Sequence, residues 1–92
     1  MTEALSADTL TGGIDPIALL RNRIDALDEG IVRLIAERAR LSAQVQANRL
    51  AAGGVRLELG RERQVVDTYR TALGVAGPAL ADAILRTCRG PL

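Results

Sequence analysis

Apolar residues recur at every third or fourth position from Pro16 to about Ala52. This spacing places them on one face of an α-helix. Asp15 before Pro16 is a typical helix start, and Gly53 followed by Gly54 is a typical helix stop. The residues of this apolar stripe are Ile17, Leu20, Ile24, Leu27, Ile31, Leu34, Leu41 and Val45. The sequence therefore predicts one helix of about 37 residues, roughly 55 Å long at 1.5 Å per residue.

A helix of this length cannot cover its apolar stripe within its own chain. A compact chain of 92 residues has a radius of gyration of only about 12 Å. Cys88 is the single cysteine, so no disulfide can form within one chain, and without histidine a zinc site is not expected. Oligomerisation is the remaining way to stabilise the fold. We expect a homodimer in which two long helices pair.

The rest of the chain predicts two shorter helices. One spans Glu58 to Leu73 with Gly74 as its stop, and the other runs from Pro78 to about Cys88. The side chains expected to face inward are Val65, Tyr69 and Leu73 on the first of these, and Leu80, Ile84, Leu85 and Cys88 on the second. Residues 1–14 show no sustained period, so we expect a disordered tail there and an all-α domain over residues 15–92.

Composition limits the chemistry that the chain can perform. All twelve basic residues are arginines, the formal net charge is +1, and there is no histidine to act as a general base or to activate Cys88. No apolar run approaches the roughly 20 residues of a membrane span, and the N-terminus lacks a signal-peptide pattern. We expect a cytoplasmic protein whose catalysis, if any, rests on charge placement, carboxylates or amides.

Arginine occupies one position of the apolar stripe. Arg38 stands where the period calls for an apolar residue, and Arg49 follows 11 residues later. At 100° per residue the two differ by only about 20° around the helix axis and lie roughly 16 Å apart along it. Their side chains can therefore reach a small anion between them, next to Ser42 and Val45. Burying a guanidinium without a partner costs several kcal/mol, so this position requires an anion.

The second helix carries charge on its inward face as well. Glu58, Arg61 and Glu62 share that face with Val65 and Tyr69. Structural explanations exist for four of the charged positions on the two helices. Glu37 or Glu62 could pair with Arg38, Glu62 could pair with Arg49, Arg49 suits the C-terminal end of a helix, and Glu58 and Glu62 suit an N-terminal turn.

Arg21 lies 17 residues before Arg38, roughly 25 Å along the same helix. The two cannot share a ligand within one chain. If two long helices pack antiparallel, the partner subunit's Arg21 arrives near Arg38.

The order of these residues is similar to that of a known family over about residues 15–74. It reads LLRNRIDALDEGIVRLIAERARLSAQVQANR, then a glycine break, then VRLELGRERQVVDTY. This order resembles the AroQ-type, all-α chorismate mutases. The resemblance implies an intertwined homodimer of three-helix chains with two equivalent active sites. It also implies rearrangement of chorismate to prephenate, toward phenylalanine and tyrosine, without cofactor or metal.

By this resemblance, the arginines bind the substrate. Arg21 resembles an arginine donated by the neighbouring subunit to one substrate carboxylate, and Arg38 resembles the one that holds the other carboxylate. Arg49 resembles the cation at the ether oxygen, and Arg61 a supporting arginine. Chorismate is a dicarboxylate, and its breaking C–O bond leaves negative charge on the ether oxygen. Arginines at these positions suit that chemistry, which needs no acid, base or nucleophile.

The resemblance also assigns carboxylates and a regulatory partner. Glu62 resembles the glutamate that receives the substrate hydroxyl, and Glu58 stands where many members have an aspartate. Cys88 and Leu92 stand where many members have a serine and a glutamine. The short end CRGPL instead resembles an actinobacterial subclass that is weak alone and activated by docking onto DAHP synthase. It implies weak activity alone and partner contacts at Gly53–Leu59 and Arg86–Leu92.

Three alternatives remain open at this stage. Isochorismate pyruvate lyase shares this fold and a similar anion site. An arginine-rich dimeric helix could bind nucleic acid, although the net charge near zero and the single tyrosine argue against it. A helical hairpin or adaptor could use the arginines only for structure. A neutral substitution of Arg38 separates this last alternative from an enzyme.

Overall fold

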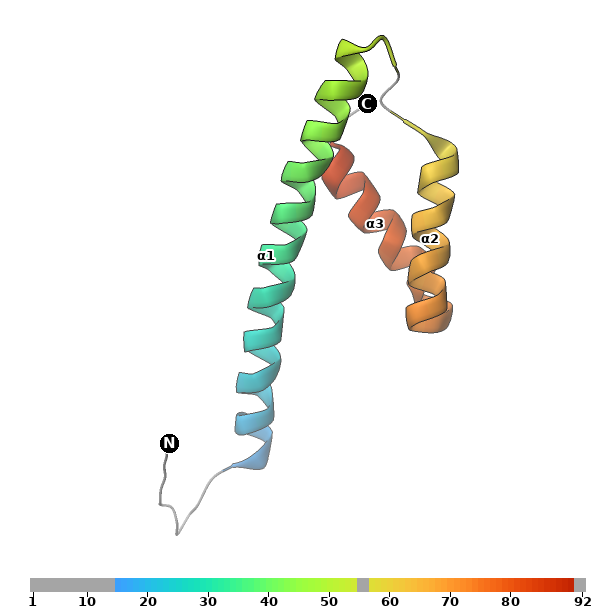
Figure 1. Ribbon diagram of the computed structural model, residues 1–92. Helices are drawn as coiled ribbons and strands as arrows, with labels where there is room; N and C mark the ends of the chain where they lie inside the picture. The colour runs from blue at the N-terminus through green and yellow to red at the C-terminus, as the bar shows by residue number, and fades with distance from the viewer. Residues whose placement is uncertain (1–14, 55–56, 91–92) are drawn as a thin grey trace. The chain divides into compact units, whose positions relative to one another are not determined.

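The structure, a computed structural model, describes residues 15–54 and 57–90. These residues form α1 (Pro16–Ala51), α2 (Leu59–Leu73), the short 3-10 helix η1 (Gly74–Ala76) and α3 (Gly77–Arg89) (Figure 1). No strand occurs among them, so the all-α fold with one long and two short helices is confirmed. The predicted tail, residues 1–14, lies outside the described residues.

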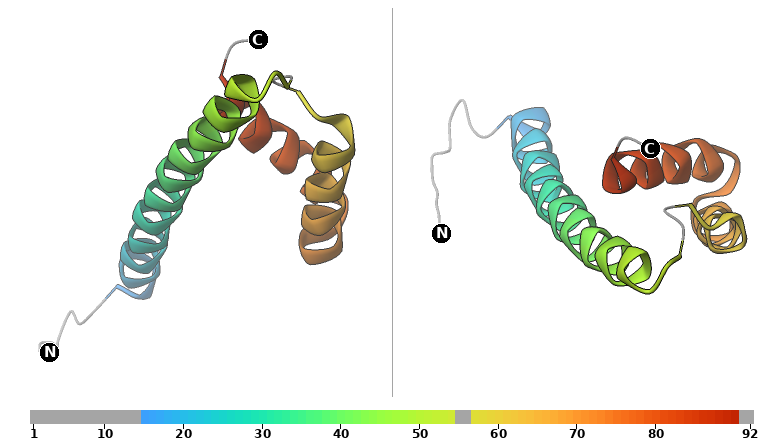
Figure 2. Two further views of the ribbon diagram at one scale, coloured as in Figure 1. Left: turned by 45° about the horizontal axis from the view of Figure 1, so that its top comes forward. Right: turned by 90° about the horizontal axis from the view of Figure 1, so that it is seen from above.

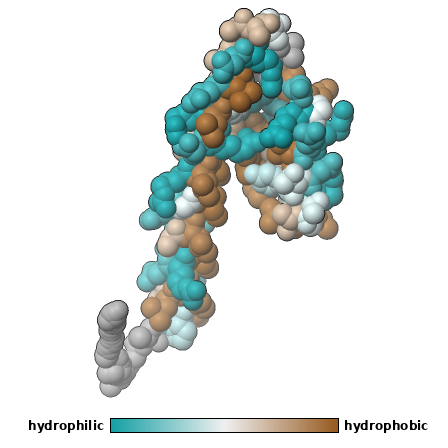
Figure 3. Space-filling model, viewed as in Figure 1, coloured by the Kyte–Doolittle hydropathy of each residue, from teal (hydrophilic) through white to brown (hydrophobic). Residues whose placement is uncertain are grey.

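The chain divides within α1 into two compact units, residues 1–33 and 34–92. In the first unit, α1 begins as predicted, because Asp15 Oδ1 accepts a hydrogen bond of 2.9 Å from the Ile17 backbone N–H and Pro16 opens the helix. The apolar stripe of α1 is uncovered in the single chain. None of its residues is buried, and Figure 3 shows hydrophobic side chains following the helix. The described part of the chain contains no helix that is both long and apolar enough to cross a membrane.

α1 ends in a Schellman motif, and this motif fixes Arg49. The Gly53 N–H donates to Leu50 O at 3.0 Å, and the Gly54 N–H donates to Arg49 O at 2.8 Å. Gly53 has φ 83°, which L side chains rarely adopt. A Cβ on Gly54 would lie 2.5 Å from Arg49 Cγ, so glycine is required where the Arg49 side chain passes the helix end.

The second unit has a small core between α2 and α3. Its buried apolar residues are Val65, Ala81, Leu85 and Cys88. α3 leaves the end of α2 at an angle, and its own end lies beside the second half of α1, where Gln46 Nε2 donates to Arg89 O at 3.3 Å (Figures 1 and 2).

Two residues predicted to face inward do not. Leu73 is 54% exposed and Leu80 is 46% exposed in this chain. The residues of α3 that pack against α2 recur at positions 77, 81, 85 and 88, so Leu80 lies beside this line rather than on it. Leu73 is the last residue of α2, where η1 already turns the chain away.

Gly77 permits the close approach of α3 to α2. A Cβ at this position would lie 2.3 Å from Tyr69 O, 2.6 Å from Tyr69 C and 2.8 Å from Arg70 Cα. These are backbone atoms, which cannot move aside as the end of a flexible side chain can. The hairpin geometry therefore depends on glycine here.

We expect Gly77→Ala to lower the free energy of unfolding by about 2 kcal/mol, because α3 must shift to accommodate the methyl group. Gly60→Ala is the matched control, since only Glu58 Oε1 at 3.7 Å lies near its Cβ position. We expect it to change stability by less than about 0.5 kcal/mol. Urea unfolding followed by circular dichroism measures both. Equal stabilities would show that the α2–α3 contact adapts to a methyl group.

Candidate active site

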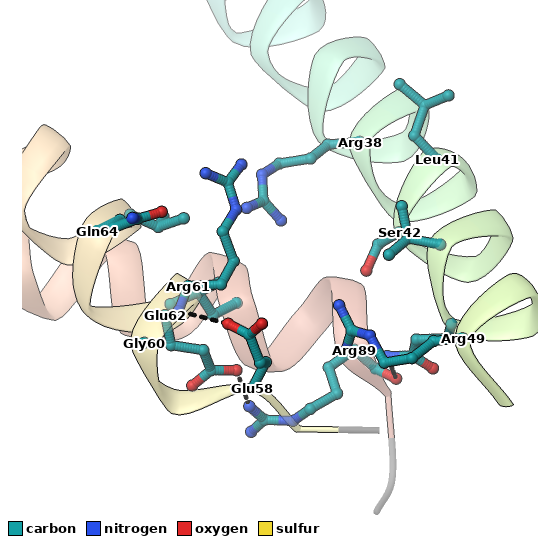
Figure 4. Close-up of a pocket in the computed structure, with 14 residues that line it drawn as sticks. Arg38, Leu41, Ser42, Arg49, Glu58, Gly60, Arg61, Glu62, Gln64 and Arg89 are labelled. Carbon is teal, nitrogen blue, oxygen red and sulfur yellow. Dashed lines mark hydrogen bonds and ion pairs between the residues drawn. The ribbon is translucent and has the colours of Figure 1, made fainter. Parts of the chain in front are cut away.

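A pocket of about 620 Å³ lies within the second unit, a volume typical of small-molecule sites. It is formed by the second half of α1, the first turns of α2 and the end of α3. Its charged lining residues are Arg38, Arg49, Glu58, Arg61, Glu62 and Arg89 (Figure 4). Its apolar lining comes from Leu41, Val45, Val65 and Leu85, and its polar lining includes Ser42, Gln46 and Gln64.

Five of the six site residues predicted from the sequence therefore line one pocket. The sixth, Arg21, belongs to the first unit and is not among the lining residues. Its assignment to a neighbouring subunit's site stays a prediction.

Arg38 has no hydrogen-bond or ion-pair partner among the described residues, although it is only partly exposed. The predicted structural partners are engaged elsewhere, because Glu37 pairs with Arg40 and Glu62 pairs with Arg89. Arg61 likewise has no side-chain partner in this part of the chain. Figure 4 shows the Arg38 and Arg61 side chains extending from α1 and α2 into the same space. Two cations without counter-charges leave this pocket prepared for an anion.

Glu58 caps α2 rather than beginning it. Its backbone is extended (φ −124°, ψ 103°), and its Oε1 accepts a hydrogen bond of 2.8 Å from the Arg61 backbone N–H. The structural interpretation of Glu58 as a helix-terminus residue is thus confirmed. The same bond fixes the first turn of α2, from which Arg61 and Glu62 project.

Glu62 makes an ion pair that the sequence analysis did not predict. Arg89 Nη1 lies 2.5 Å from Glu62 Oε2, with side-chain exposures of 15% and 25%. The predicted alternatives, pairing of Glu62 with Arg38 or Arg49, are not what the structure shows. Arg89 Nε is buried and has no hydrogen-bond partner in the described part of the chain. An unsatisfied buried donor of this kind costs about 1–3 kcal/mol.

Arg89 is the site residue that the sequence analysis missed. The family resemblance implies only a partner-contact segment at this position. The inward spacing of α3 contained the signal, because Arg89 follows Leu85 by four residues and so falls on the margin of the buried face.

The charge of the pocket selects a class of ligand. Four arginines face two glutamates, an excess of two positive charges, over an apolar lining. A compact dianion with a hydrophobic middle matches this distribution. No cluster of His, Cys, Asp and Glu side chains able to hold a metal ion occurs in residues 15–54 and 57–90.

Comparison with known proteins identifies the family. The family model "Chorismate mutase type II" matches residues 20–89. The chain belongs to this family. The resemblance to all-α chorismate mutases that the sequence suggested is therefore confirmed.

Named relatives support the family assignment. An intracellular chorismate mutase of Mycolicibacterium smegmatis is 42% identical over 73 residues, which cover 79% of this chain and 70% of that protein. An intracellular chorismate mutase of Mycobacterium tuberculosis is 40% identical over 86% of this chain and 74% of that protein.

The structural match is a chain of a non-covalent complex of DAHP synthase and chorismate mutase from Corynebacterium glutamicum with a bound transition state analog. Its TM-score is 0.79 at 36% identity, and the match covers 83% of this chain and 92% of that chain.

We expect Glu58→Ala to lower the free energy of unfolding by about 1 kcal/mol, the usual effect of losing a helix N-cap. Glu58→Gln keeps an oxygen that can accept from the Arg61 N–H and should cost less than about 0.5 kcal/mol. Urea unfolding of the two variants separates the cap from the charge. Equal losses would assign the effect to the negative charge at the helix terminus instead of the hydrogen bond.

Proposed function

We propose that the chain converts chorismate to prephenate by an intramolecular rearrangement, using the pocket between α1, α2 and α3. The observation that carries this proposal is a pair of guanidinium groups, Arg38 and Arg61, that have no partner within residues 15–54 and 57–90 and face one cavity with Glu62. Membership of the chorismate mutase family supports the choice of substrate.

The arginines bind and polarise the substrate. Arg38 holds one carboxylate, the partner subunit's Arg21 holds the other, and charge-assisted bonds from a planar guanidinium suit both. Arg49 lies at the ether oxygen, where negative charge grows as the C–O bond breaks. A cation there stabilises the transition state more than the bound substrate, which raises kcat. Arg61 supports this cluster of cations from α2.

The glutamates and the pocket wall orient the reacting groups. Glu62 accepts a hydrogen bond from the substrate hydroxyl, and Glu58 contributes to the same side of the site. The apolar lining from Val45, Val65 and Leu85 favours a compact conformation in which the side chain lies over the ring. Fixing this geometry supplies the remaining part of the rate enhancement. The reaction needs no cofactor.

We also propose that the active form is a homodimer in the cytoplasm. The uncovered apolar stripe of α1 supports pairing of two long helices, and the named relatives are called intracellular. Pairing places Arg21 of each subunit in the other subunit's site.

DAHP synthase is the proposed activating partner. The C. glutamicum complex supports this, because its chorismate mutase was solved bound to DAHP synthase. Cys88 is buried in the core, so no polar group replaces the family serine there, and Leu92 lies outside the described residues. A site lacking these polar groups is expected to be weak alone. The proposed contact segments are residues 53–59 and 86–92, of which 55, 56, 91 and 92 also lie outside the described residues.

The test follows the loss of chorismate absorbance and identifies prephenate as product, with and without the DAHP synthase of the same organism. A weak rate that rises when the synthase is added supports both the reaction and the partner. A high rate without it removes the activation proposal. Release of pyruvate from isochorismate, with no prephenate from chorismate, would establish the lyase instead.

Arg38→Gln should lower kcat/KM for chorismate by about 100-fold or more, because it removes a charge that the transition state requires. It should leave stability unchanged or raise it, because an uncompensated guanidinium disappears. The matched control is Arg40→Gln, on the same helix but outside the pocket and paired with exposed Glu37. Retained turnover in Arg38→Gln would indicate a purely structural role.

A site shared between subunits predicts complementation. Arg21→Ala and Arg38→Ala chains should each be inactive as homodimers. Mixed in equal amounts after unfolding and refolding, they should recover about a quarter of wild-type activity, because half of the dimers carry one intact site of two. If the mixture is no more active than the two separate variants, Arg21 does not belong to the partner's site.

A further inference from the structure

Arg89 connects the three helices that form the pocket. It is the last residue of α3, its Nη1 contacts Glu62 of α2 at 2.5 Å, and its backbone oxygen accepts from Gln46 of α1 at 3.3 Å. Figure 4 shows its side chain among the charged groups of the site. Among the described residues of α3, Arg89 alone makes polar contacts to both α1 and α2.

The ion pair differs from the other pairs in the described part of the chain. Arg40–Glu37, Arg70–Asp67 and Arg86–Asp82 each join residues three or four apart on one helix, and all six side chains are half exposed or more. Such surface pairs contribute little. Arg89 and Glu62 are 27 residues apart and largely withdrawn from solvent. Charges in that setting interact more strongly and hold a defined geometry.

The ion pair with Arg89 leaves one oxygen of the Glu62 carboxylate available to accept a hydrogen bond. Arg89 binds Oε2, and Oε1 accepts no hydrogen bond from the described residues. A carboxylate held at one oxygen by a guanidinium turns its other oxygen to a fixed direction. That is what an acceptor for a substrate hydroxyl needs.

The contact between Arg89 and Glu62 also carries a cost in free energy. The Arg89 Nε is buried without a hydrogen-bond partner among the described residues, so Arg89 pairs with Glu62 although one of its donors stays unsatisfied.

We propose that Arg89 is a positioning residue of the site: it orients Glu62 for the substrate hydroxyl and makes that orientation depend on the end of α3. This inference rests on the proposed chorismate mutase activity. Arg89 acts through Glu62 and does not itself contact the substrate.

The test is a double-substitution cycle in the chain, with chorismate turnover as its first readout. Arg89→Gln should lower kcat about tenfold while KM changes by less than about twofold, because the carboxylate-binding arginines remain. Arg89→Lys, which can still pair with Glu62, should recover activity to within about threefold of wild type. The matched control is Arg70→Gln, on α2 outside the pocket and paired with exposed Asp67, which should stay within about twofold.

The decisive comparison is made in the Glu62→Gln background. If Arg89 acts through Glu62, Arg89→Gln causes no further loss there. Losses that multiply would overturn the inference, because Arg89 would then act on the substrate directly or through the fold. Failure of Arg89→Lys to recover activity would also count against it.

A second readout does not require activity. Urea unfolding of the same four proteins (wild type, both single variants and the double variant) measures the coupling between Arg89 and Glu62. If the wild-type chain shows no turnover, with or without DAHP synthase, the proposed function fails, and the unfolding cycle alone decides whether the ion pair exists. Zero coupling there would overturn the inference whatever the kinetics show.

Discussion

The candidate site depends on a guanidinium group placed on an apolar stripe. Arg38 interrupts the regular spacing of α1, lies only partly exposed and lacks a counter-charge among the described residues. In a purely structural helix this arrangement would be unfavourable, and an apolar or paired residue would be better. An anion bound in the pocket would make it favourable. In the proposed function, the charge excess of the pocket and the placement of Glu62 serve the same anion.

Three charged side chains of the candidate site are positioned by the ends of helices. Arg49 lies in the last turn of α1 within the Schellman motif, Glu62 lies in the first turn of α2, and Arg89 is the last residue of α3. Each end is fixed by a specific local device: the Gly54 contact with Arg49, the Glu58 cap, and Gly90 with φ 74° after Arg89. The hydrogen bonds that satisfy backbone groups at a helix terminus therefore also hold charged side chains of the candidate site in place.

Features that depend on periodicity and local signals could be predicted from the sequence. Helix α1, its glycine stop and the convergence of Arg38 and Arg49 follow from spacing along a single helix. Contacts between helices were harder to predict. The Glu62–Arg89 pair joins residues 27 apart, and its geometry is set by how α3 returns from η1, which no local pattern encodes. The prediction that Leu80 faces inward is wrong for the same reason. The residues of α3 that contact α2 are determined by the close approach at Gly77, which no local pattern encodes.

The uncovered stripe of α1 has a consequence for the protein in solution. Ile24, Leu27 and Ile31 are all more than half exposed in one chain. Chains that leave this surface uncovered can associate with one another in any register, and exposed apolar surface of this extent favours aggregation. Because association increases with concentration, losses should be greatest in concentrated samples, and a partner that covers the stripe should reduce them.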